Sequence, residues 1–155
     1  IYSVHPFGNT MCVIRVTGQQ VLDALEWGAR AVPSENGGFL QVSGLTYEIH
    51  TGVASSAEKD ENGMFTRVSG EYRVKNVMVG GQPLELDKTY TLASHNYMLL
   101  NHGDGYTMFD GCEVLGEDMM IDNQVLITYI TTTLGGVVGE QYANPYGDGR
   151  IVAVE

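Results

Sequence analysis

The sequence predicts an α+β fold: a single domain with a mixed β-sheet, two main helices and long loops at the strand ends. Several segments have the β-branched composition or the alternation of strands, and two stretches have apolar residues at helical spacing. Strands and helices interleave without the strict order of βαβ units, which favours a mixed sheet. With 155 residues, the chain is long enough for one ordinary domain and too short for two comfortable ones.

The first predicted elements are a strand and a helix. Residues 11–16 (MCVIRV) form a β-branched run that is typical of a strand. Thr17 is a candidate helix N-cap, and Gln20 three residues later completes a capping box. The apolar residues that follow predict one amphipathic helix over residues 18–31, ended by Pro33 and the SENGG stretch.

The middle of the chain is predicted to begin with a strand and a loop. Residues 39–50 (FLQVSGLTYEIH) alternate as a strand does, with Gly44 marking a bulge or a close backbone approach. Residues 52–70 are polar, Gly-rich and weakly patterned, which predicts a surface loop. Asn62-Gly63 is typical of the turn of a short hairpin within that loop.

The second half begins with two further strands. Residues 72–79 alternate again, Gly80-Gly81 predicts a tight hairpin turn, and residues 89–94 (TYTLAS) form the next strand.

The last elements are a helix and a closing strand. Asp122 is expected to cap a helix that runs to about Leu134 and is ended by Gly135-Gly136. Residues 150–154 (RIVAV) form the closing strand. The expected buried side of the helix is formed by Val125, Leu126, Tyr129 and Ile130.

Composition excludes several classes of function. Lys and Arg total 8 against 19 Asp and Glu, so the net charge of −11 repels a phosphate backbone and argues against binding of a nucleic-acid polymer. A local pocket could still accept a small anionic ligand. No apolar run approaches the ~20 residues of a membrane span. The 2 cysteines argue against a disulfide scaffold and a cysteine-based zinc site. Because the chain begins at Ile1 inside an apolar stretch, we expect a fragment of a longer protein.

Two kinds of catalytic site are disfavoured by the residues present. His102 and Asp104 could be metal ligands, but the chain has only 4 histidines and no Asp-x-His, so a loop histidine beside a turn aspartate is favoured. No G-x-S-x-G elbow occurs. Cys12 lies in an apolar strand and is predicted to be a buried inert thiol, and Cys112 lies near acidic residues that should raise its pKa.

A binding constellation remains. Phe7 lies in PFGN, and Tyr97 lies shortly before Asp104 in a segment broken by Gly103 and Gly105. Two rings can stack on the faces of a base at about 1–3 kcal/mol each, and a carboxylate can accept hydrogen bonds from the two ribose hydroxyls. These residues therefore suit a nucleoside, although an aromatic residue between Pro and Gly is also typical of a loop anchor.

Six motifs follow one another along the chain: PFGNT at 6–10, VTG at 16–18, LDALE at 22–26, GGFLQVSGL at 37–45, KTYTLAS at 88–94 and HGDGYTMF at 102–109. In this order they resemble the C-terminal domain of the 5′-nucleotidase family, which includes UDP-sugar hydrolases and 2′,3′-cyclic-nucleotide phosphodiesterases. The resemblance covers nearly the whole chain.

The resemblance implies that two domains share the reaction, one binding the nucleoside and the other hydrolysing the phosphate. Residues 1–155 would be the C-terminal, nucleoside-holding domain of a longer enzyme. An N-terminal calcineurin-like metallophosphoesterase domain, absent from this chain, would carry a divalent metal pair, and the C-terminal domain would rotate to deliver the phosphate to it. The expected partners are a nucleotide or nucleoside and that N-terminal domain of the same polypeptide. The expected location is periplasmic, secreted or at the cell surface.

The resemblance also assigns residues. Phe7 matches the first stacking phenylalanine, Asn9 belongs to the same substrate-binding motif, and Asp104 matches the aspartate of the GGDG loop that holds the ribose. The second stacking position points to Tyr97; because the spacing is one residue longer than usual, Met98 is the alternative.

Two departures from the family pattern bear on activity. The first loop glycine is replaced by His102, which would narrow the pocket or add a donor near the sugar. The phosphate-clamping Asn-Gly-Gly-x-Arg element falls upstream of Ile1, and Arg15, Arg30, Arg67 and Arg150 match no such motif. The isolated chain is therefore expected to bind nucleosides weakly and to hydrolyse nothing. The alternatives are a binding or structural module without a nucleotide role, and a self-sufficient phosphoesterase.

Overall fold

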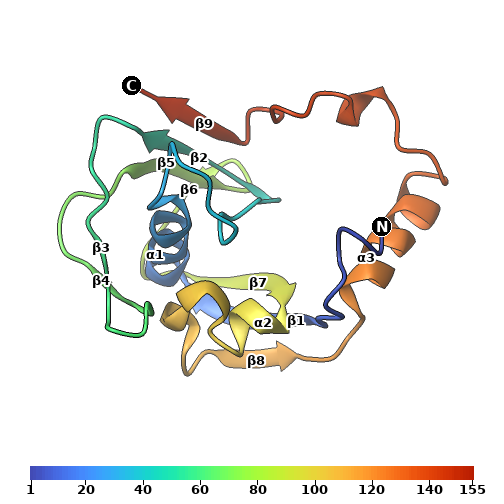
Figure 1. Ribbon diagram of the computed structural model, residues 1–155, viewed down its shortest axis with the longest axis horizontal. Helices are drawn as coiled ribbons and strands as arrows, with labels where there is room; N and C mark the ends of the chain where they lie inside the picture. Colours follow the sequence, from blue (N-terminus) through green and yellow to red (C-terminus); the bar gives the residue numbers. More distant parts are fainter.

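The computed structural model describes residues 1–155 as an α+β fold in which a four-stranded mixed sheet and a three-stranded antiparallel sheet lie on either side of a central helix, with a separate two-stranded hairpin (Figure 1). The predicted fold class is confirmed. The antiparallel sheet has the order β7-β1-β8: its strands are Thr89–His95, Met11–Thr17 and Glu113–Gly116. The mixed sheet has the order β6-β5-β2-β9: its strands are Gln82–Pro83, Val74–Val79, Leu45–His50 and Ile151–Val154. Strand β9 runs parallel to β2, and the other neighbours are antiparallel.

Helix α1 (Gly18–Ala29) lies between the two sheets and carries much of the core (Figure 1). The predicted capping box is present: Thr17 Oγ1 accepts from the Gln20 backbone N–H over 3.2 Å, and Gln20 Oε1 accepts from the Thr17 N–H over 2.8 Å. Alternate residues of β1 point into the core, and α1 contributes Leu25 and Trp27, which is 1% exposed. The helix is thus fixed at its N-terminus and packed along its length.

The predicted loop over residues 52–70 contains the predicted hairpin. Strands β3 (Ala57–Lys59) and β4 (Phe65–Val68) pair antiparallel. Asn62-Gly63 lies in the turn, where Gly63 has a φ of +81° and its N–H donates to the Asp60 carbonyl. The Asn62-Gly63 dipeptide therefore predicted the hairpin correctly.

The strand predicted over residues 39–50 is too long, because β2 begins only at Leu45. Residues 39–44 form a loop over the C-terminal end of α1, where Asn36 Nδ2 donates to the Gly28 carbonyl. Phe39, Leu40 and Val42 pack against the core from this loop. Apolar side chains of this segment therefore contact the core without any strand pairing.

Helix α3 (Asp122–Thr128), continued by a π-helical turn (Tyr129–Thr133), agrees with the predicted helix in extent but not in packing. None of its residues is buried, so the predicted buried side of Val125, Leu126, Tyr129 and Ile130 is wrong. Asp122 is the first helical residue, not the N-cap, which is Ile121. The reason for the exposure is placement: α3 lies beside the N-terminal segment, away from α1 and the mixed sheet (Figure 1).

The remaining short helices lie next to the antiparallel sheet or in the long return to β9. They are α2 (Asn96–Leu99), the 3-10 turns Gly103–Gly105 and Thr107–Phe109, and the 3-10 turn Glu140–Tyr142. No helix has the length and apolar character needed to cross a bilayer.

Candidate functional site

The N-terminal loop, which leads into β1, and helix α2, which follows β7, lie side by side at the same end of the antiparallel sheet. Met11 pairs with His95 at the end of the β1–β7 ladder. Beyond it, the Thr10 N–H donates to Asn96 Oδ1 over 3.1 Å, and the Asn96 N–H donates to the Thr10 carbonyl over 2.8 Å. These two bonds fix the PFGN loop against the start of the helix that carries Tyr97.

The PFGN loop presents an exposed ring. The Phe7 residue is 87% exposed and is followed by Gly8 with a φ of +70°. A β-carbon at Gly8 would lie 3.6 Å from the Ile121 side chain, and the Asn9 carbonyl accepts from the Asp122 N–H over 2.8 Å. The backbone is therefore anchored next to Gly8, while the phenyl ring gains nothing from core burial.

Tyr97 lies over Gly103. A β-carbon at Gly103 would come within 2.3 Å of the tyrosine ring, so only glycine permits this close approach. The Tyr97 ring is also 5.9 Å from the His95 ring at an interplanar angle of 30°, and the residue is 44% exposed. The neighbouring Met98 packs against the core instead. Of the two alternatives for the second stacking position, Tyr97 is thus the one with an exposed ring.

Asp104 is exposed on a loop whose backbone is fixed from the core. Its φ of +53° is in the left-handed region, which aspartate tolerates better than most residues. Its carbonyl accepts from Trp27 Nε1 over 2.9 Å. A β-carbon at Gly38 would lie 3.0 Å from the Asp104 β-carbon, so the 37–45 motif borders this carboxylate.

His102 is engaged within its own loop. Its Nε2 is hydrogen-bonded to Asp110 Oδ1 across the turn, which ties the ring to this carboxylate. No group of three or more His, Cys, Asp or Glu side chains is arranged to hold a metal ion. The carboxylate that holds His102 is that of Asp110, not that of Asp104.

The two thiols lie in environments that suppress reactivity. Cys12 is fully buried, as predicted, and burial is the main cause that raises its thiol pKa. Burial also raises the pKa of Cys112, with a smaller contribution from the Asp110 carboxylate. A thiolate nucleophile is therefore disfavoured at both positions.

Sequence reasoning missed Trp27 and Arg30 as neighbours of the site. The Arg30 guanidinium carbon lies 3.7 Å from the centroid of the Trp27 ring, and Arg30 Nη1 donates to the Trp27 carbonyl over 2.6 Å. Burial lowers the pKa of Arg30, and the charge of Asp104 is one of the groups that oppose this shift. The sequence offered one indication of this, because both residues closely follow the LDALE motif.

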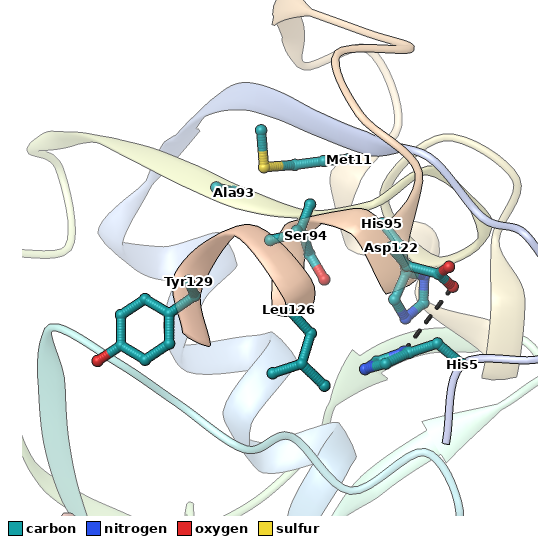
Figure 2. A pocket seen from close by; sticks show the side chains of 9 residues that line it. His5, Met11, Ala93, Ser94, His95, Asp122, Leu126 and Tyr129 are labelled. Carbon is teal, nitrogen blue, oxygen red and sulfur yellow. Dashed lines mark ion pairs between the residues drawn. The ribbon is translucent and has the colours of Figure 1, made fainter. Parts of the chain in front are cut away.

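A cavity of about 450 Å³ lies next to these loops, between β7, α3 and the N-terminal segment (Figure 2). Its polar end contains His5, His95 and Asp122, with His5 Nδ1 3.8 Å from Asp122 Oδ2. The remaining lining residues are Met11, Ala93, Ser94, Val125, Leu126 and Tyr129. His5 and His95 each precede a proposed stacking residue by two positions, so the cavity adjoins the candidate site.

Comparison with known proteins identifies the family. The family model described as the 5′-nucleotidase C-terminal domain matches residues 1–111. This chain belongs to that family. The Bacillus subtilis trifunctional nucleotide phosphoesterase protein YfkN is 30% identical over 99% of this chain and 9% of its own length. The Vibrio vulnificus 5′-nucleotidase is 27% identical over 84% of this chain and 20% of its own.

Solved structures of the family share the fold. The 5′-nucleotidase precursor from Thermus thermophilus superposes with a TM-score of 0.75 at 30% identity, over 99% of this chain and 27% of that one. The chain thus spans only a small fraction of the relatives that it matches.

Proposed function

We propose that this 5′-nucleotidase C-terminal domain recognises the nucleoside part of a nucleotide that a metallophosphoesterase domain hydrolyses. The base stacks between Phe7 and Tyr97, the Asn9 amide contacts the base edge, and Asp104 accepts hydrogen bonds from the ribose hydroxyls. The observation that carries this proposal is the pairing of Thr10 with Asn96, because it joins the loop of the exposed Phe7 ring to the helix of Tyr97.

The burial pattern supports this assignment. The Phe7 residue is 87% exposed on an anchored loop, so its ring contributes little to folding and is accessible to a ligand. Tyr97 is fixed by Gly103 yet remains 44% exposed. Stacking on each ring is worth about 1–3 kcal/mol, enough for weak binding in the absence of a phosphate clamp.

The longer protein implied by the relatives supplies the rest of the reaction. We infer an N-terminal metallophosphoesterase domain on the same polypeptide; a divalent metal pair bound there would supply Lewis-acid activation of water and of the phosphate. The residues of this chain orient the nucleoside for that step in nucleotide catabolism. We infer a location outside the cytoplasm, at the cell surface or in the periplasm; one relative, from Listeria monocytogenes, is named a cell wall protein.

Stacking is tested by calorimetric titration of adenosine and uridine into the 155-residue chain. We expect dissociation constants in the high micromolar range or weaker for the wild type and no detectable binding for Phe7→Ala, with an unchanged free energy of unfolding. Tyr146→Ala is the matched control, because Tyr146 is 95% exposed but lies outside the site. Unchanged nucleoside affinity in Phe7→Ala would show that Phe7 does not contact the base.

The ribose contact is tested separately with Asp104→Asn. An amide is a weaker acceptor than a carboxylate, so the variant should bind adenosine several-fold more weakly. It should bind 2′,3′-dideoxyadenosine as the wild type does, because that ligand lacks both hydroxyls. An equal loss for the two ligands would contradict a ribose role for Asp104.

A binding or structural module without a nucleotide role is the second candidate. It is favoured by helix α3, because none of its residues is buried and its apolar side chains are therefore available to a partner. It predicts no nucleoside binding at all. Phosphoesterase activity of the chain itself is tested with a chromogenic phosphodiester and added divalent metal. Turnover would contradict the proposal that a separate domain hydrolyses the phosphate.

A further inference from the structure

His95 lies where strand β7 passes into helix α2. It is the last residue of the strand and the N-cap of the helix, with extended φ and ψ values of −83° and 153°. Its Nδ1 accepts a hydrogen bond from the Met98 backbone N–H over 3.3 Å. Side-chain oxygens of Ser, Thr, Asp or Asn usually fill this role. A histidine can do so only while Nδ1 carries no proton, that is, as the neutral imidazole protonated on Nε2.

The His95 ring also contacts the ring proposed to stack on the base. The His95 and Tyr97 ring centroids are 5.9 Å apart. Because Tyr97 also touches Gly103, its ring is limited by a glycine backbone and by the imidazole. Both the backbone of α2 and the side chain of Tyr97 therefore depend on His95.

We propose that the neutral His95 imidazole positions Tyr97 for stacking, by capping α2 and by packing against the phenol ring, and that protonation of His95 weakens nucleoside binding. The inference rests on the nucleoside site proposed above. His95 touches no reacting atom; it acts through Tyr97. Protonation places a second N–H donor opposite the Met98 N–H, so the cap is lost.

The surroundings of His95 determine its protonation. Burial is the largest cause that lowers the pKa of His95, and the His5 imidazole lowers it further. Asp122 on α3 and Asp104 oppose this shift. Tyr97 is the other titratable group that faces the ring. The imidazole is therefore neutral near neutral pH and becomes protonated on acidification.

The experiment compares adenosine affinity at about pH 7.5 and about pH 5, a range in which ordinary carboxylates stay ionised. We expect the affinity of the wild type to fall at least several-fold at the lower pH. His95→Asn keeps a capping oxygen without a titratable ring, so it should bind with little pH dependence. His95→Ala should bind weakly at both pH values. His5→Asn is the matched control, since it removes the neighbouring imidazole but leaves the cap, and it should retain the loss at acid pH.

A second measurement reads the cap directly. The amide proton of Met98 should shift in NMR spectra with the same midpoint as the His95 ring, and this shift should be absent in His95→Asn. If Phe7→Ala abolishes binding but His95→Ala binds as the wild type does, this inference fails and the nucleoside site stands. If the wild type binds no nucleoside, the proposed function fails and takes this inference with it.

Discussion

The indole Nε1 of Trp27 donates a hydrogen bond of 2.9 Å to the backbone carbonyl of Asp104, 77 residues away in the sequence. Trp27 is 1% exposed on the helix at the centre of the fold, and Asp104 lies exposed on the loop proposed to hold the ribose. The bond thus joins a fully packed side chain of the core to the backbone of the site. This hydrogen bond explains how Asp104, whose backbone is in the left-handed region, keeps a fixed position in a glycine-rich loop.

Trp27→Phe should therefore lower both stability and affinity. The variant loses the indole N–H and part of the ring volume, at a cost of about 2–4 kcal/mol in the free energy of unfolding. Adenosine affinity should fall with it, because the Asp104 carbonyl loses its donor. The measurements are urea unfolding and calorimetric titration. Phe65→Leu is the control, because Phe65 packs edge-on against Trp27 at 5.7 Å without a hydrogen bond to Asp104. It should lose stability only; equal losses of affinity in both variants would contradict a specific role for the Trp27 bond.

Gly103→Ala tests the placement of Tyr97. The added methyl group would lie 2.3 Å from the ring, so Tyr97 must move away from the loop. We expect adenosine binding to weaken by about 1–3 kcal/mol, the value of one stacked ring. Gly37→Ala is the control, because a β-carbon there meets no atom within 4 Å. Wild-type affinity in Gly103→Ala would show that Tyr97 is not the second stacking residue.

Local signals in the sequence predicted local structure well. The capping box of Thr17 and Gln20 and the Asn62-Gly63 turn each depend on residues within a few positions, so their partners are known from the sequence. The strand prediction failed over residues 39–44, because a loop packed on the end of α1 places Phe39, Leu40 and Val42 against the core without strand pairing.

The long-range contacts of the site could not be predicted in the same way. Phe7, Tyr97 and Asp104 were proposed from motifs, but the bonds of Asn96 to Thr10 and of Trp27 to Asp104 join segments that only the fold brings together. The side of α3 that the apolar spacing predicted to be buried is not, because spacing shows which residues share a face but not what covers it.

Glu26 should make stability depend on pH. The residue is 0% exposed, its Oε2 accepts from the Val74 N–H over 2.8 Å, and its Oε1 has no partner. Burial is the main cause that raises the pKa of Glu26, opposed by backbone hydrogen bonds and by the charge of the buried Arg73. A raised pKa favours the protonated form in the folded state. Its contribution to stability is therefore present below the unfolded pKa and lost as the pH rises through the folded pKa.

The measurement is the difference in the free energy of unfolding between the wild type and Glu26→Gln, from about pH 4 to about pH 8. We expect the wild type to lose stability relative to the variant as the pH rises, since glutamine does not ionise. Glu61→Gln, on the exposed hairpin turn, serves as the control and should show no such trend of comparable size. A difference that is constant with pH would contradict the raised pKa.

Truncation of Leu126 should cost far less stability than truncation of Leu25. A compact protein of 16.9 kDa exposes roughly 7,700 Å², whereas this chain exposes 9278 Å², and α3 with no buried residue accounts for part of the difference. Leu25→Ala in α1, where the side chain is 2% exposed, should cost about 2–5 kcal/mol. Leu126→Ala should cost less than about 1 kcal/mol, because the side chain lines an open cavity. Urea unfolding of both variants measures the two costs. Equal costs would mean that α3 packs against the body of the domain in solution, as its apolar spacing predicts.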